Sequence, residues 1–85
     1  SYVTSLIYSL DMAVRVNQQD TIDLVIGCLI DVYSEVNVAK TLNIKQHNID
    51  KLFLLLDDLS GRNTHILLSK LEFVYDRPCG DTPKT

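Results

Sequence analysis

The chain has 85 residues, of which 46% are hydrophobic and 22% are charged, and its net charge is −3. This length supports one domain with a single core, in which a deep substrate cavity would be difficult to stabilise. The hydrophobic fraction excludes a disordered chain, and three glycines and two prolines are too few for a turn-rich β-sandwich or barrel. The acidic balance is unlike that of a typical nucleic-acid-binding domain, and the longest apolar run, Leu24–Ile30, is far shorter than the roughly 20 residues of a membrane span.

The first predicted helix covers residues 1–16. Its apolar residues recur at helical spacing and form one stripe, made of Tyr2, Leu6, Leu10 and Ala13 and widened by Val3, Ile7 and Val14. The polar residues 17–19 mark a break after this helix. Asp20 is then expected to cap the next one.

The second predicted helix, residues 21–36, is the most hydrophobic segment of the chain. Ile22, Val25, Ile26 and Leu29 fall at helical spacing, and Leu24, Cys28 and Ile30 widen their stripe until little polar face remains. Such a pattern predicts a buried, central helix. Residues 24–33 are also rich in β-branched side chains, so a strand is the alternative.

Three shorter helices are expected after these two. Asn37 is expected to cap residues 38–42, the cluster 46–48 leads into residues 49–59, and Asn63 starts the last helix, which closes at Asp76 before Arg77-Pro78. Gly61 has the position of a residue that ends the fourth helix. The sequence therefore predicts an all-α fold, a compact bundle of about five amphipathic helices in one domain over residues 1–78, followed by a short disordered tail over residues 79–85.

No residue pattern indicates an enzyme. His47 and His65 have no carboxylate or cysteine at ligand spacing, and the three glycines, at positions 27, 61 and 80, lie too far apart for a phosphate-binding loop. We therefore expect no catalytic residue, metal or cofactor. Cys28 and Cys79 are expected to be free thiols of a soluble, intracellular protein, cytoplasmic or nuclear, with a disulfide between tail and core as the alternative.

Residues 38–52 resemble a bacterial-type helix-turn-helix. The resemblance rests on a small residue in the first helix, Ala39, a turn residue, Asn43, an apolar residue after the turn, Ile44, and a β-branched residue in the second helix, Ile49. It implies that Lys45, Gln46, His47, Asn48 and Lys51 contact DNA. The acidic residues that follow oppose this role, because phosphate contacts dominate affinity for DNA.

The whole chain also resembles a death-effector-type domain of the death-fold superfamily. The resemblance rests on the Tyr2…Leu6…Leu10 helix, on the segment 52–59 (LFLLLDDL), which is similar to the family's leucine-phenylalanine helix, and on a helix that begins at Asn63 and ends near Arg77. It implies a six-helix bundle that associates with similar domains. Where the family has an Arg-x-Asp-Leu signature this chain reads RPCGD at residues 77–81, and the final helix is missing.

Several apolar residues lie beside the main helical stripes, and this favours a protein-binding surface. An exposed apolar patch marks a partner site, and the candidates are Ile26, Ile30, Leu54, Leu55 and Phe73. The sequence thus predicts a non-enzymatic interaction module, an adaptor or an oligomerisation domain, whose partner is another protein or a second copy, without a membrane role. A DNA-binding regulator that uses residues 38–52 is the alternative, and a mundane alternative for the apolar residues is that they fill a broad core.

Overall fold

The structure is a computed structural model that describes residues 2–77. All of the regular elements in this range are α-helices, as the sequence predicts: α1 (Tyr2–Arg15), α2 (Gln19–Ser34), α3 (Val36–Ala39), α4 (Gln46–Asp57) and α5 (Arg62–Val74). The expected tail, residues 79–85, and the last residue of the expected domain, Pro78, lie outside the described residues.

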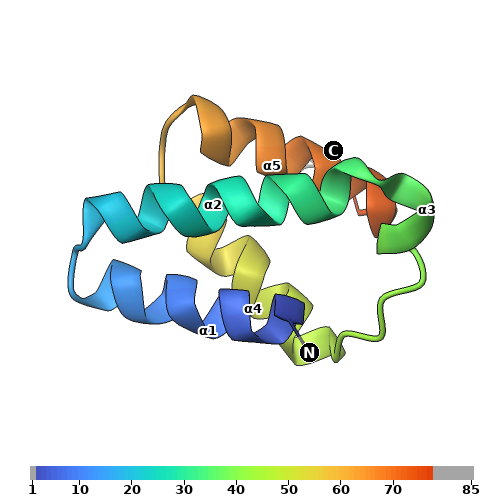
Figure 1. Cartoon of the computed structure of the whole chain (residues 1–85), viewed down its shortest axis with the longest axis horizontal. Helices are drawn as coiled ribbons and strands as arrows, with labels where there is room; N and C mark the ends of the chain where they lie inside the picture. Colours follow the sequence, from blue (N-terminus) through green and yellow to red (C-terminus); the bar gives the residue numbers. More distant parts are fainter. Residues whose placement is uncertain (1, 78–85) are drawn as a thin grey trace, which may run out of the picture.

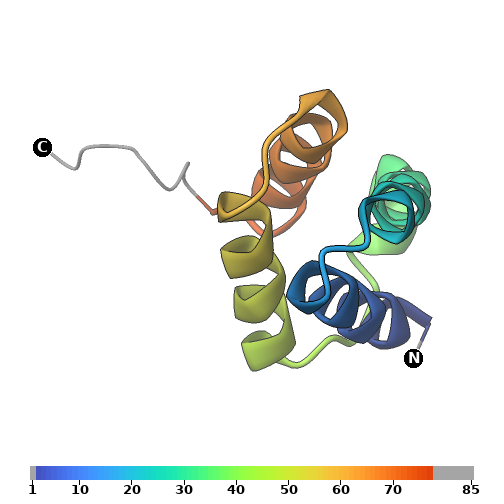
Figure 2. The same ribbon diagram turned by 90° about the vertical axis from the view of Figure 1, so that its left-hand side faces the viewer.

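The helices form a bundle in which α2 and α4 lie on opposite sides. Helices α1 and α2 form an antiparallel hairpin, and α5 packs along the other flank of α2 (Figure 1). Helix α4 contacts both α1 and α5 from the side that faces away from α2, as the turned view shows (Figure 2). One side of the molecule is therefore built by the α1–α2 hairpin and the other by α4.

The second segment is a helix throughout, and the strand alternative for residues 24–33 is wrong. Helix α2 contacts α1 on one flank and α5 on the other. Its β-branched residues therefore fill a wide buried face on a helix, because tertiary packing overrides their preference for strands. Ile22, Val25, Ile26, Leu29 and Tyr33 are its buried residues.

The buried hydrophobic side chains form one cluster to which α1 to α5 all contribute. The largest of those that are almost wholly buried are Tyr33, Ile7, Leu10, Ile26, Leu29, Leu52, Leu56, Leu67 and Leu71. In α1 the buried residues are Val3, Ile7, Leu10 and Ala13. The buried face therefore contains Val3 and Ile7 in place of Tyr2 and Leu6, which the sequence placed at its centre. Tyr2, expected on that face, is 63% exposed, and Leu24 of α2 is 68% exposed.

The helices begin at residues other than the expected caps. Asp20 lies inside the first turn of α2, whose N-cap is Gln18, and Asn37 lies inside α3, whose N-cap is Glu35. Asn63 is likewise the second residue of α5. Gly61 does not end α4, which stops at Asp57. It caps the start of α5 with φ 127° and ψ 163°, a backbone conformation that is open almost only to glycine.

Two helices end in the same backbone motif, which is a Schellman turn. Asn17 (φ 57°) and Asp76 (φ 49°) adopt the left-handed conformation after α1 and α5. In each case the next residue donates its N–H to a carbonyl five residues back, Gln18 to Ala13 at 2.9 Å and Arg77 to Glu72 at 3.0 Å. The second turn brings Arg77 back onto α4, where its guanidinium lies 4.1 Å from the centre of the Phe53 ring and bonds to Asp50 at 3.0 Å.

Candidate interaction surface

Large hydrophobic side chains are exposed mainly on one part of the chain. Six of the eight in the described range lie between residues 2 and 38: Tyr2, Tyr8, Met12, Val16, Leu24 and Val38, each at least 50% exposed. The other two are Leu54 of α4 and Phe73 of α5. We refer to these six residues, which lie on α1, α2 and α3 and in the turn after α1, as the hairpin surface.

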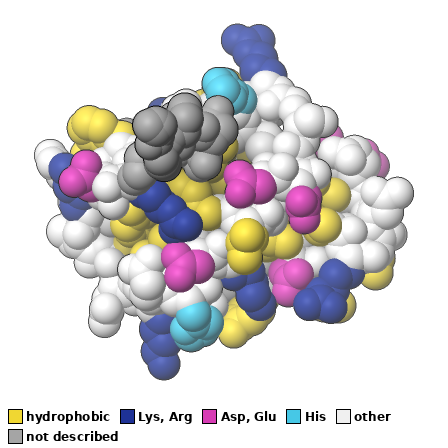
Figure 3. Space-filling view, turned by 180° about the vertical axis from the view of Figure 1, so that it is seen from behind, with side chains coloured by type: hydrophobic (Ala, Val, Ile, Leu, Met, Phe, Trp, Pro, Cys, Tyr) yellow, Lys and Arg dark blue, Asp and Glu magenta, His cyan; other side chains and the backbone are white. Residues whose placement is uncertain are grey.

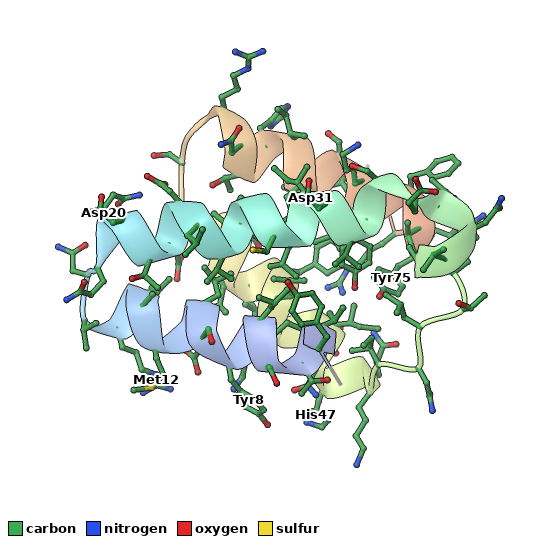
Figure 4. The ribbon with its side chains drawn as sticks, viewed as in Figure 1. Tyr8, Met12, Asp20, Asp31, His47 and Tyr75 are labelled. Carbon is green, nitrogen blue, oxygen red and sulfur yellow. The ribbon has the colours of Figure 1, made fainter. Side chains whose placement is uncertain are left out.

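The first groove on this surface runs along the outer side of α1. Tyr8, Met12 and Val16 follow one another at four-residue spacing, so their side chains form a row on a face opposite the buried one. Figure 4 shows Tyr8 and Met12 pointing away from α2 at the edge of the bundle. Together with Ser9, Ala13, Gln18 and Thr21 they line a shallow apolar groove of about 420 Å³.

The second groove lies at the opposite end of the hairpin, where the start of α1 meets the end of α2. Tyr2, Val3, Val32, Val38 and Leu42 give it an apolar wall, and Asp31 and Glu35 stand beside them. Its volume is about 310 Å³. This groove therefore combines exposed apolar side chains with two carboxylates and has no basic residue among those that line it.

Tyr2, Cys28 and Asp31 lie close together beside the second groove. A hydrogen bond with the Cys28 thiol raises the pKa of the Tyr2 phenol, and the neighbouring Asp31 carboxylate raises it further. Leu24 lies one turn before Cys28 on the same side of α2, so the apolar surface continues from the groove along this helix. Cys28 is half-buried and forms no disulfide within residues 2–77, and Cys79, the other half of the alternative disulfide, lies outside the described residues.

Helix α2 and its C-cap carry acidic side chains without any basic ones. Together they hold four of the eleven acidic residues and none of the eight basic ones: Asp20, Asp23, Asp31 and Glu35, all exposed. The ion pairs formed within residues 2–77 use Asp11 and Asp50 instead. Figure 4 shows Asp20 near one end of α2 and Asp31 near the other.

Asp31 has an unfavourable position for the stability of its own helix. It lies in the last turn of α2, where the aligned peptide dipoles leave a partial negative charge, and no basic residue occupies that turn. A carboxylate there is destabilising by a few tenths of a kcal/mol in general.

The side of the molecule that carries α4 has a different charge pattern from α2, because acidic and basic side chains are interspersed over it (Figure 3).

The apolar residues selected from the sequence do not form one surface. Ile26 is 2% exposed and belongs to the core, so the expectation that it is available to a partner is wrong. Ile30 and Leu55 are half-buried and pack against the core. Leu54 and Phe73 are exposed as expected, but they lie on different helices and line no common groove with the other candidates within residues 2–77. The Lys40 ammonium lies 5.3 Å from the centre of the Phe73 ring.

The residues selected for DNA contact differ in their exposure. Lys45, Gln46 and His47 are exposed at the start of α4, where Gln46 donates to Asp50 at 3.1 Å. Asn48 is 5% exposed and is thus withdrawn from any groove of DNA, and its side-chain oxygen is buried without a hydrogen-bond partner. Lys51 is 3.4 Å from the Asp11 carboxylate, and its ammonium lies 5.3 Å from the centre of the Tyr8 ring.

The local geometry of residues 38–52 also departs from a helix-turn-helix. Helix α3 has only four residues, and it is followed by a turn and a stretch without regular structure before α4 begins at Gln46. Asn43 does not adopt the left-handed conformation expected of a sharp turn, since the non-glycine residues with positive φ in the described range are Asn17 and Asp76. The sequence resemblance therefore reflects the spacing of apolar residues.

Among residues 2–77, no three histidine, cysteine or acidic side chains are arranged to hold a metal ion. No helix in the same range is long and apolar enough to cross a membrane.

Comparison of the chain with protein-family models, with curated proteins and with solved structures finds no significant match in any of the three. The resemblance to death-effector-type domains therefore stays a prediction.

Proposed function

We propose that this chain is a non-enzymatic protein–protein interaction module that binds its partner through the hairpin surface. The observation that carries the proposal is the concentration of exposed large hydrophobic side chains in the hairpin surface, where five of the six line two grooves. Burial of apolar surface is favourable by about 25 cal/mol per Å². Binding of a partner that removes these side chains from water is therefore stabilised by their burial.

The hairpin surface is more than the scattered apolar residues that most protein surfaces expose. Isolated exposed hydrophobic residues need no explanation, whereas grouped ones mark interaction sites. Tyr8, Met12 and Val16 form a continuous row, and tyrosine and methionine are enriched at the centres of protein interfaces. An intracellular location is part of the proposal and is supported by Cys28, whose thiol forms no disulfide within residues 2–77.

The proposal is tested by capture of a partner protein on the wild-type domain and on two variants, each of which replaces two exposed hydrophobic side chains by serine. The wild-type domain, the double variant Met12→Ser/Leu24→Ser and the double variant Leu54→Ser/Phe73→Ser are immobilised and exposed to an extract of the cells that make the protein. All four substituted side chains are at least 60% exposed, so both variants are expected to remain folded, as circular dichroism would check.

We expect a protein that is retained by the wild type and by Leu54→Ser/Phe73→Ser and lost from Met12→Ser/Leu24→Ser. The reverse pattern would move the interaction to the α4–α5 side and contradict the proposal. Sedimentation of the purified domain over a range of concentrations identifies the case in which the partner is a second copy.

A further inference from the structure

We infer that the second groove binds a basic, amphipathic helical segment of the partner protein, with the segment's apolar side in the groove and its Lys or Arg side chains against Asp31 and Glu35. The inference rests on the proposed function and adds the chemistry of the partner.

The shape of the surface suits a helix laid into a groove. Tyr2 of α1, Val38 of α3 and Leu42, which follows α3, border the groove, and Leu24 extends the apolar surface along α2. A helix binds such a surface through apolar anchors at positions i, i+3 or i+4, and i+7. On α2, the side chains of Leu24, Cys28 and Asp31 are likewise spaced by four and then three residues and so lie along one face of the helix. A partner helix can therefore contact this face over two turns.

The charge of the groove selects a basic segment over an acidic or neutral one. Asp31 and Glu35 are exposed and take part in none of the ion pairs within the described range. Lys40 is a basic residue near this end of the molecule, but its ammonium is directed onto the Phe73 ring. A Lys or Arg of the partner would therefore meet two carboxylates and the negative end of the α2 dipole, without a competing cation among the residues described for this groove.

A second copy of the chain fits this groove less well. Two copies joined through α2 would bring eight carboxylates together without a basic residue, because α2 and its C-cap carry four acidic residues and no Lys or Arg. Like charges placed opposite one another oppose such a pairing. Nucleic acid is disfavoured at this groove for the same reason, since its phosphates are negative.

The test uses three labelled synthetic peptides of equal length. The first carries leucine at positions 1, 4, 5, 8, 11 and 12 of a helix with lysine on its flanks. The second has the same leucines with glutamate in place of lysine, and the third has the composition of the first in a scrambled order. Each is titrated with the domain and followed by fluorescence anisotropy.

We expect saturable binding of the lysine peptide and at least tenfold weaker binding of the other two. The scrambled peptide separates a groove from charge attraction alone, and the glutamate peptide separates charge selection from apolar burial alone. Binding of the lysine peptide is expected to weaken as salt is raised from 50 to 300 mM, because ions screen surface charges. Equal binding of the lysine and glutamate peptides, or no binding of the lysine peptide, would overturn the inference.

Two matched pairs of variants locate the binding site. Asp31→Asn/Glu35→Gln is expected to weaken binding of the lysine peptide about 5- to 10-fold, since each exposed ion pair contributes little by itself. Asp57→Asn/Asp58→Asn, which removes the same charge from exposed positions on the α4 side, is expected to change it less than twofold. Val38→Ser is expected to weaken binding and Leu54→Ser is not, although both side chains are more than 50% exposed.

Equal losses within either pair would show that the peptide binds elsewhere and would overturn the inference. The proposed function is judged separately. If the lysine peptide fails to bind while Met12→Ser/Leu24→Ser still abolishes capture of a protein from the extract, the interaction module stands and the basic partner is wrong.

Discussion

The phenolic hydroxyls of Tyr33 and Tyr75 lie 2.7 Å apart and share a hydrogen bond, with the two rings edge to face at 5.9 Å between centres. Tyr33 is 1% exposed in α2, and Tyr75 caps the end of α5. The pair joins two helices through a part-buried hydrogen bond, in which the Tyr33 side chain is the more deeply buried of the two. It therefore provides a test of how the bundle is held together.

Tyr75→Phe is expected to destabilise the fold by about 1–3 kcal/mol, because it leaves the buried Tyr33 hydroxyl without a partner. The double variant Tyr33→Phe/Tyr75→Phe removes both hydroxyls and is expected to be more stable than Tyr75→Phe alone. Urea unfolding followed by circular dichroism gives both free energies. A double variant that is less stable than the single one would contradict this account of the pair.

The same two tyrosines predict a loss of stability at alkaline pH. Burial raises the pKa of Tyr33 far above its ordinary value, and the hydrogen bond to Tyr75 raises it further. Burial also raises the pKa of Tyr75. The folded state thus keeps protons that the unfolded chain loses above about pH 10, so stability is fully present below pH 10 and decreases above it, by at most about 1.4 kcal/mol per pH unit for each group. Tyr33→Phe/Tyr75→Phe is the control, and its stability is expected to depend less on pH in this range.

The lowered pKa values of Asp11 and Asp50 lead us to expect a loss of stability at acidic pH as well. The pKa of Asp11 is lowered chiefly by its hydrogen bond from Arg15, and that of Asp50 by its hydrogen bond from Gln46, then by Arg77. Groups with a lowered folded pKa stabilise the protein above the ordinary carboxyl pKa of about 4, and this contribution is lost as the pH falls below that value. Thermal unfolding between pH 6 and pH 2 is expected to show a falling midpoint, with a smaller fall in Asp11→Asn/Asp50→Asn.

Leu24 and Leu29 of α2 test which side of this helix faces the core. Leu29 is 0% exposed and Leu24 is 68% exposed. Leu29→Ala is expected to lower the free energy of unfolding by about 2–5 kcal/mol through loss of packing, and Leu24→Ala by less than about 0.5 kcal/mol. Chemical denaturation measures both, and a comparable loss in the two variants would mean that α2 is oriented differently.

The sequence predicts the helices well and their surfaces poorly. Each helix buries one face against the rest of the fold, so its apolar residues recur at helical spacing. This spacing located the five helices to within a few residues. Caps depend on local backbone geometry, and Asp20 and Gly61 were assigned to the wrong positions for this reason. Ile26 was placed both in the helical stripe of the second helix and among the surface candidates, and it is buried because α2 is covered on two flanks and buries a wide face.

The hairpin surface was missed although the sequence contains a signal for it. Tyr8, Met12 and Val16 repeat every four residues and fall outside the stripe assigned to the core, so a helical projection of α1 would have revealed a second apolar row. The second groove could not be found in this way. It is formed by Tyr2, Asp31 and Val38, which are brought together only by the antiparallel packing of α1 and α2 and the turn into α3.

The most direct test of the central claim is to map the lysine peptide onto the ¹⁵N-labelled domain by changes in amide chemical shift. We expect the largest changes at Tyr2, Leu24, Cys28, Asp31 and Val38, with little change at Leu54 and Phe73. Changes centred on α4 or α5, or spread evenly over the acidic residues of the whole chain, would contradict the claim that a basic helical segment binds at the second groove of the hairpin surface.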